Sequence, residues 1–222
     1  MVTNFNTIQK KTLFLLLFLS TLYLLTSCQQ TRPVNIIAKP ILFDAKRITL
    51  TQQYRRKHYG IKSSSITIKP RMIVLHWTGG KDLASAYETL YPASLCGRQE
   101  LKKGGDLNVS AHFIVDRDGK IYQLMPTNKM ARHVIGLNNI AIGIENVGGV
   151  NDVEDLTNAQ LEANIYLIRL LKKQYPKIKY VIGHYEYGAL RHTLLWQEKD
   201  PKYFTYKSDP GIKFMQSVRG KL

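Results

Sequence analysis

Cysteine and acidic residues are scarce in this sequence of 222 residues. Only 2 cysteines are present, which excludes a fold built on disulfides and any zinc site made of four thiolates. The 16 Asp and Glu face 32 Lys and Arg, so the formal net charge is +16. This charge favours an anionic partner, whether nucleic acid, a membrane surface or an anionic polymer, but it indicates no particular chemistry. Hydrophobic residues at 44% and charged residues at 22% are typical of a globular protein and argue against disorder.

The N-terminus has the pattern of an export signal. Lys10 and Lys11 precede an apolar run over residues 13–25, which is shorter than the roughly 20 residues that a membrane-spanning helix needs. We therefore expect a signal peptide over residues 1–27. Export also argues against nucleic acid as the partner, because an exported protein meets little of it.

The end of this signal resembles the lipobox of bacterial lipoproteins. Residues 25–28 read Leu-Thr-Ser-Cys, and in that pattern the cysteine is acylated and becomes the first residue of the mature chain. We expect lipid on Cys28, with an ordinary signal peptide and a chance cysteine as the alternative. Gln29 follows, rather than the Asp that retains lipoproteins at the inner membrane. The expected location is the cell envelope, at the outer membrane facing the periplasm.

Residues 28–70 are rich in basic side chains and lack strong apolar periodicity, and Arg55-Arg56-Lys57 is their densest cluster. We interpret this segment as a basic tether beside the lipid, where each basic residue near an anionic membrane adds about 1 kcal/mol of binding. A packed N-terminal extension is the alternative, because residues 41–43 and 66–68 are apolar enough to lie against a domain.

A single compact domain is expected over residues 71–222. Buried-strand runs alternate with helical patterns, and a loop of functional length separates two of them. This alternation predicts an α/β (α+β) fold, a single domain with a central mixed β-sheet flanked by helices. The expected strands cover residues 72–75, 140–145 and 180–183, and the hairpin covers 112–124 with a turn at Asp118-Gly119. The expected helices cover 82–90 and 157–175, the second beginning with a capping box at residues 157–160, and the loop covers 91–108.

Three polar residues stand at or directly after apolar strands, namely His76, Glu145 and His184. Functional sites are often built at such positions. Two histidines and a carboxylate with an open fourth position form a catalytic zinc site, in which the metal lowers the pKa of bound water to about 7. Residue type and spacing alone do not select the ligands among the 6 histidines.

Five short blocks distinguish among the candidate ligands. They are IVLHWTGG at 73–80, SAHFIV at 110–115, IGIE at 142–145, IGH at 182–184 and KSDPG at 207–211. In this order along the chain, they resemble the type 2 N-acetylmuramoyl-L-alanine amidases, a family that includes the amidase-type phage lysozymes and the peptidoglycan recognition proteins. Any single block would be weak, but five in order are specific, and together they cover nearly all of the expected domain.

The resemblance implies a zinc amidase domain over residues 71–222, with one Zn²⁺ per chain on His76, His184 and Asp209. It further implies that Glu145 is the catalytic acid/base and that Lys207 stabilises the oxyanion. The implied reaction cleaves the amide bond between N-acetylmuramic acid and L-alanine, with peptidoglycan or muropeptides as partners of a monomeric protein. A non-catalytic peptidoglycan-binding lipoprotein of the same fold is the alternative.

Five further positions are informative. His112 and His133 match histidines of many relatives, which implies that they bind substrate or support the metal ligands; a structural role in the core is the alternative. His58 and His192 match no block, so we expect surface or structural roles for them. The phage enzymes carry a tyrosine where this chain has Ala111, so a mechanism that uses that hydroxyl is not open to this chain.

Overall fold

The structure is a computed structural model that describes residues 35–97 and 99–222. The expected signal peptide and Cys28 lie outside the described residues. Among the helices of the described part, none has the length and apolar character needed to cross a bilayer.

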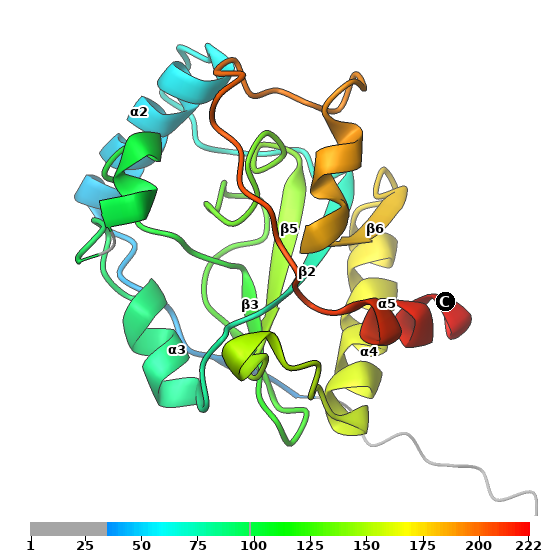
Figure 1. The fold of residues 1–222 in the computed structure, drawn as a ribbon. Coiled ribbons are helices and arrows are strands. Elements are labelled where there is room, and N and C mark those ends of the chain that lie inside the picture. The colour runs from blue at the N-terminus through cyan, green and yellow to red at the C-terminus, as the bar shows by residue number, and fades with distance from the viewer. Residues whose placement is uncertain (1–34, 98) are drawn as a thin grey trace, which may run out of the picture. The chain divides into compact units, whose positions relative to one another are not determined.

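A mixed β-sheet forms the centre of the described part of the chain (Figure 1). Its order is β1-β4-β3-β5-β2-β6, and neighbouring strands are parallel except for the antiparallel hairpin of β3 and β4. The hairpin turns at Gly119, whose φ of +83° suits glycine. The expected central mixed sheet is confirmed. The strands are β1 (Ile36–Ala38), β2 (Met72–Trp77), β3 (Phe113–Val115), β4 (Ile121–Gln123), β5 (Ala141–Asn146) and β6 (Tyr180–Gly183).

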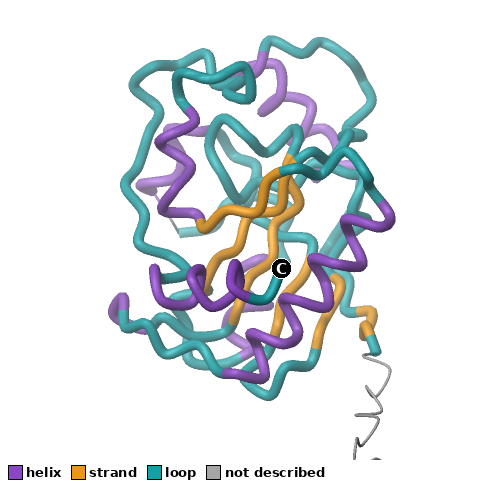
Figure 2. The backbone as a smooth tube through the Cα atoms, turned by 90° about the vertical axis from the view of Figure 1, so that its right-hand side faces the viewer, coloured by secondary structure: helices purple, strands orange, loops and turns teal. Residues whose placement is uncertain are grey.

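Helices flank the sheet, as expected. α4 (Asn158–Gln174) and α5 (Ile212–Gly220) pack on one face of it, and Figure 2 views the sheet from their side. α3 (Leu83–Leu90) packs in a cluster on the opposite face. The predicted capping box of α4 is present, because Thr157 Oγ1 accepts from the Gln160 N–H while the Gln160 side chain accepts from the Thr157 N–H.

The alternation of side chains along β2 decides which face carries polar residues. Ile73 and Leu75 pack into the cluster that contains α4 and α5, whereas Met72 and Val74 pack into a separate cluster. Because successive side chains of a strand point to opposite faces, His76 lies on the face away from α4. The apolar core therefore leaves one face of the sheet for the site.

Residues 35–70 are a packed extension, so the tether interpretation is wrong for this part of the chain. β1 pairs with β4, and α2 (Ala45–Tyr59) begins at Asp44, whose carboxylate accepts from the Arg47 N–H at 2.8 Å. Within the basic cluster, Arg55 is only 5% exposed and donates to the Asn139 side chain at 3.0 Å. The buried positions of α2 are filled by polar and aromatic side chains, so the sequence shows no apolar period. They are Arg47, Thr51, Tyr54, Arg55, His58 and Tyr59.

Arg47 shows how the extension is attached. Its side chain is 1% exposed and donates hydrogen bonds to the backbone carbonyls of Leu42, Leu90, Tyr91 and Pro92, at 2.6 to 3.1 Å. Burial lowers the pKa of Arg47 to about 10, so the guanidinium remains charged at neutral pH. One cation thus joins α2 to the chain that leaves α3.

We expect Arg47→Met to lower the free energy of unfolding by about 3 kcal/mol, because buried carbonyls lose their donor. The neighbouring exposed residue provides the control, since Lys46→Met should change that free energy by no more than about 0.5 kcal/mol. Urea unfolding of both variants and the parent chain measures the difference. Equal stability of all three proteins would mean that the extension is only loosely attached.

Candidate active site

Three potential metal ligands from distant parts of the chain meet at one point. His76 Nδ1, His184 Nδ1 and Asp209 Oδ2 lie 3.0 Å from one another in every pairing. All three residues are buried. The structure thus brings together the three residues to which the resemblance assigned the metal.

Parallel pairing explains the meeting of the two histidines. In the register of β2 and β6, Leu75 is the partner of Gly183. His76 and His184 directly follow these two residues. Because side chains that are opposite each other in a sheet point the same way, both histidines project to the same face. Asp209 joins them from the segment before α5, where its backbone carbonyl accepts from the Tyr185 N–H at 3.0 Å.

The charge states of the cluster suit a divalent cation. Burial lowers the pKa of His184 to about 4, and the charges of His76 and Lys207 act in the same direction, so His184 is neutral at neutral pH. Burial by itself raises the pKa of Asp209, but its interactions with His184 and His76 outweigh this effect and hold that pKa well below its usual range. Two imidazoles and one carboxylate are a donor set of catalytic zinc. The residues present therefore fit this metal.

A second hydrogen bond fixes the orientation of the His76 ring. His76 Nε2 lies 3.0 Å from His133 Nδ1, and His133 Nε2 lies 3.4 Å from the Ala141 carbonyl oxygen. Because a carbonyl only accepts, His133 Nε2 carries the hydrogen, and His133 Nδ1 accepts from His76 Nε2–H. The lone pair of His76 Nδ1 then faces the other two ligand atoms. Burial lowers the pKa of His133 well below its usual value, which keeps this ring neutral.

His112 occupies a structural position rather than the cleft surface. Its side chain is fully buried, its Nδ1 accepts from the Gly143 N–H at 3.0 Å, and its Nε2 donates to the Lys129 carbonyl at 2.8 Å. Burial lowers the pKa of His112 to about 4. The ring lies beside His133, with 5.9 Å between ring centroids. Of the two histidines singled out together, His133 contacts a ligand and His112 supports the sheet behind it.

A cleft of about 660 Å³ lies over the cluster. Glu145 and Lys207, the two residues expected to be catalytic, both line it. Glu145 is the partner of His76 in the register of β5 and β2, so the two side chains share a face. Lys207 is exposed and stands two residues before Asp209. The structure therefore places both residues around the same cavity as the three ligands.

Two charged residues of the cleft were not found from the sequence. Asp152 lines the cleft and accepts from the Ser208 hydroxyl at 2.7 Å, which supports the segment between Lys207 and Asp209. Asp152 and its neighbour Asn151 have φ values of +59° and +55°, a left-handed conformation that no sequence pattern predicted.

The other missed residue is Arg132, which is 3% exposed and also lines the cleft. Its guanidinium donates to the carbonyls of Leu101, Gly105 and Leu107 and to the Tyr203 hydroxyl. Its position beside His133 was the only available signal.

Comparisons with known proteins identify the family. A family model described as N-acetylmuramoyl-L-alanine amidase matches residues 66–212. The chain is 37% identical over 82 residues to an endolysin of Klebsiella phage KP32, a match that covers 35% of this chain and 54% of that endolysin. It is 32% identical over 91 residues to an endolysin of Enterobacteria phage K11, covering 39% and 60%. The chain thus spans little more than half the length of these relatives.

A solved structure of a selenomethionine AmpD derivative has the same fold, with a TM-score of 0.52 and 20% identity over 84% of this chain and 94% of that one. A mixed sheet that gathers two histidines and an aspartate at one point defines an α/β protein with a candidate metal site. The chain belongs to the type 2 N-acetylmuramoyl-L-alanine amidase family.

We expect His133→Phe to weaken zinc binding by about 10- to 100-fold, because His76 loses the acceptor that orients its ring. His133→Gln should retain most of the affinity, since an amide oxygen can accept the same hydrogen bond. Competition with a chromophoric chelator measures both affinities, and circular dichroism checks the fold. If the phenylalanine variant binds zinc as tightly as the parent chain, His133 does not orient His76.

Proposed function

We propose that the protein is a monomeric peptidoglycan hydrolase that cleaves the amide bond between N-acetylmuramic acid and L-alanine, with one zinc ion held by His76, His184 and Asp209. The observation that carries this proposal is the convergence of three ligand atoms at 3.0 Å beneath a cleft that Glu145 and Lys207 also line. The metal, when bound, would supply Lewis-acid chemistry, which makes water nucleophilic near neutral pH and polarises a carbonyl group.

Glu145 is proposed to move the proton. Its place beside His76 in the strand register puts a carboxylate at the metal edge of the cleft. There it takes a proton from the attacking water and passes it to the amide nitrogen as the C–N bond breaks. Because Ala111 offers no hydroxyl, Glu145 is the acid/base group that this proposal relies on.

Lys207 is proposed to stabilise developing charge. It lines the cleft and lies close enough to His184 to contribute to the lowered pKa of that ring. An ammonium group at this position donates to the carbonyl oxygen of the scissile amide as negative charge grows on it. This hydrogen bond stabilises the transition state more than the bound substrate, so it raises kcat.

A non-catalytic peptidoglycan-binding protein remains the second candidate. The joint presence of the three ligands, Glu145 and Lys207 around one cleft favours catalysis, because binding alone requires no proton carrier and no oxyanion donor.

We expect the zinc-loaded protein to release free stem peptides from purified sacculi, and a chelator to abolish that release.

Lys207→Ala should lower kcat by about 100- to 1000-fold, through loss of an oxyanion donor. Glu145→Gln should lower it by a similar or larger factor of about 100 to 10,000, through loss of the proton carrier. Lys213→Ala, an exposed lysine of α5 outside the cleft, is the control and should leave kcat unchanged. Sacculus binding without chelator-sensitive release would support the binding protein instead.

We further propose that Cys28 carries lipid and holds the protein at the outer membrane, facing the periplasm. Support comes from the lipobox-like residues 25–28 and from Gln29 after the cysteine. In cells fed an alkyne-labelled fatty acid, the parent chain should be labelled and Cys28→Ala should not. Cys96→Ala provides the matched control and should keep the label. Absence of label from the parent chain would contradict the lipoprotein assignment.

A further inference from the structure

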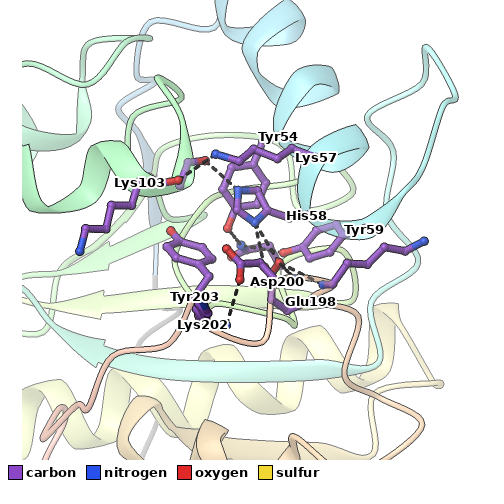
Figure 3. A network of polar contacts seen from close by, with 12 residues as sticks. Tyr54, Lys57, His58, Tyr59, Lys103, Glu198, Asp200, Lys202 and Tyr203 are labelled. Atoms are coloured by element: carbon purple, nitrogen blue, oxygen red, sulfur yellow. Dashed lines mark hydrogen bonds and ion pairs between the residues drawn. The ribbon is translucent and has the colours of Figure 1, made fainter.

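The last turn of α2 is joined to two loops by one buried histidine (Figure 3). His58 Nε2 donates to the Gly104 carbonyl at 2.8 Å, and His58 Nδ1 lies 3.0 Å from both carboxylate oxygens of Glu198. The side chains of His58 and Glu198 are each 1% exposed. A carbonyl and a carboxylate both accept, so each ring nitrogen of His58 faces an acceptor.

Glu198 in turn orders the chain that follows it. Its Oε1 accepts from the backbone N–H groups of Lys199 and Asp200, both at 3.0 Å, and the Lys199 N–H also lies 2.9 Å from the His58 carbonyl. On the other side of the helix end, Lys57 Nζ donates to the Lys103 carbonyl at 2.8 Å. The end of α2 therefore contacts both η1 (Gln99–Gly104) and the segment over residues 198–203.

Two aromatic rings pack against His58. Tyr54 stacks on His58 with 4.2 Å between ring centroids, and the Tyr203 ring lies 4.7 Å from His58. The Tyr203 hydroxyl accepts from Arg132 at 3.0 Å, and Arg132 also donates to the Leu101 carbonyl at 2.7 Å. His58 thus holds a unit whose parts come from α2, η1 and the 198–203 segment.

The same three elements each contribute to the wall of a side pocket of about 80 Å³, which residues of the segment 132–138 also line. Tyr54 comes from α2, Leu101 from η1 and Tyr203 from the third element, and all three line the pocket. The pocket shares His133, His184 and Lys207 with the cleft, so it adjoins the proposed reaction centre. Its volume is that of about three water molecules in the liquid, which is enough for a methyl or acetamido group.

We infer that His58 is a positioning residue for substrate, because it joins three elements that line this side pocket, and that the pocket takes a small group of the muropeptide beside the scissile amide. The inference rests on the proposed function for the identity of the substrate. Helix α2 lies outside residues 66–212, the part of the chain that the family model matches, so His58 supports this pocket from the N-terminal extension.

The test uses the zinc-loaded full chain and a defined muropeptide that contains the N-acetylmuramoyl-L-alanine bond. His58→Gln can donate only one of the two hydrogen bonds, so we expect KM to rise by about tenfold while kcat changes by less than about twofold, the signature of lost ground-state binding. His192→Gln replaces an exposed histidine that lines neither the cleft nor the side pocket, and it should change neither constant.

Three measurements separate a positioning role from a merely structural one. The variant should keep the zinc content of the parent chain, its amide hydrogens over residues 198–203 should exchange faster, and its calorimetric dissociation constant for the muropeptide should rise in step with KM. A folded His58→Gln protein with unchanged KM and dissociation constant overturns the inference. So does a fall in kcat with KM unchanged.

A second variant keeps the inference testable if His58→Gln does not fold. Glu198→Gln keeps an acceptor oxygen for His58 and removes only the charge, so a KM rise of about threefold or more at unchanged kcat supports the inference, and no change overturns it. If the parent chain binds the muropeptide more tightly than His58→Gln does but does not cleave it, the proposed function is refuted and the inference stands. If the parent chain neither binds nor cleaves the muropeptide, both the proposed function and the inference are refuted.

Discussion

The candidate site depends on the parallel pairing of β2 with β5 on one side and with β6 on the other. This pairing sets His76 beside Glu145 and brings His184 to the same edge of the sheet. The register is held by the opposite face, where Ile73 and Leu75 pack against residues of α4 and α5. A slip by one residue would turn His76 into that apolar core, where its polar ring would be buried without partners, so hydrophobic burial on one face fixes the chemistry of the other.

Pairing alone places His76 but does not orient it, and buried polar groups supply the orientation. The His76 carbonyl accepts from the Asn146 side chain at 2.9 Å, and the Asn146 side chain accepts from Asn164 of α4 at 2.6 Å. On the other side, the His76 ring donates to His133. Both the backbone and the ring of this ligand are thus held by protein groups, in a region where an unsatisfied polar atom is costly. Contacts within the protein alone therefore fix the position of His76.

Local patterns made much of the fold predictable. The apolar runs of β2 and β6, the turn at Gly119 and the capping box at Thr157 each depend on neighbouring residues only, and each was found where the sequence predicted it. The helix α2 was missed for a physical reason. Its buried positions are filled by side chains such as Arg47 and His58, whose burial is stabilised by hydrogen bonds to distant backbone carbonyls that no periodicity reveals.

Some residues of the site could be predicted from local sequence patterns, and others could not. His76, Glu145 and His184 could be proposed from strand ends alone, because a strand carries its last side chain to a defined edge. Asp209 and Lys207 come from an irregular segment whose path is set by tertiary contacts, so only the resemblance to a family could single them out. The same limit applies to Asp152, where the structure adds a left-handed backbone that the sequence does not signal.

The buried cations also change the meaning of the net charge. The loop over residues 91–108 has little regular structure, so many of its carbonyls need donors from elsewhere. Arg47 and Arg132 supply them, and an arginine suits this task because one rigid group carries five donors. Part of the +16 charge is therefore internal and holds the wall of the cleft in place. A basic composition can thus reflect how a protein builds an irregular loop around its site as much as which surface it binds.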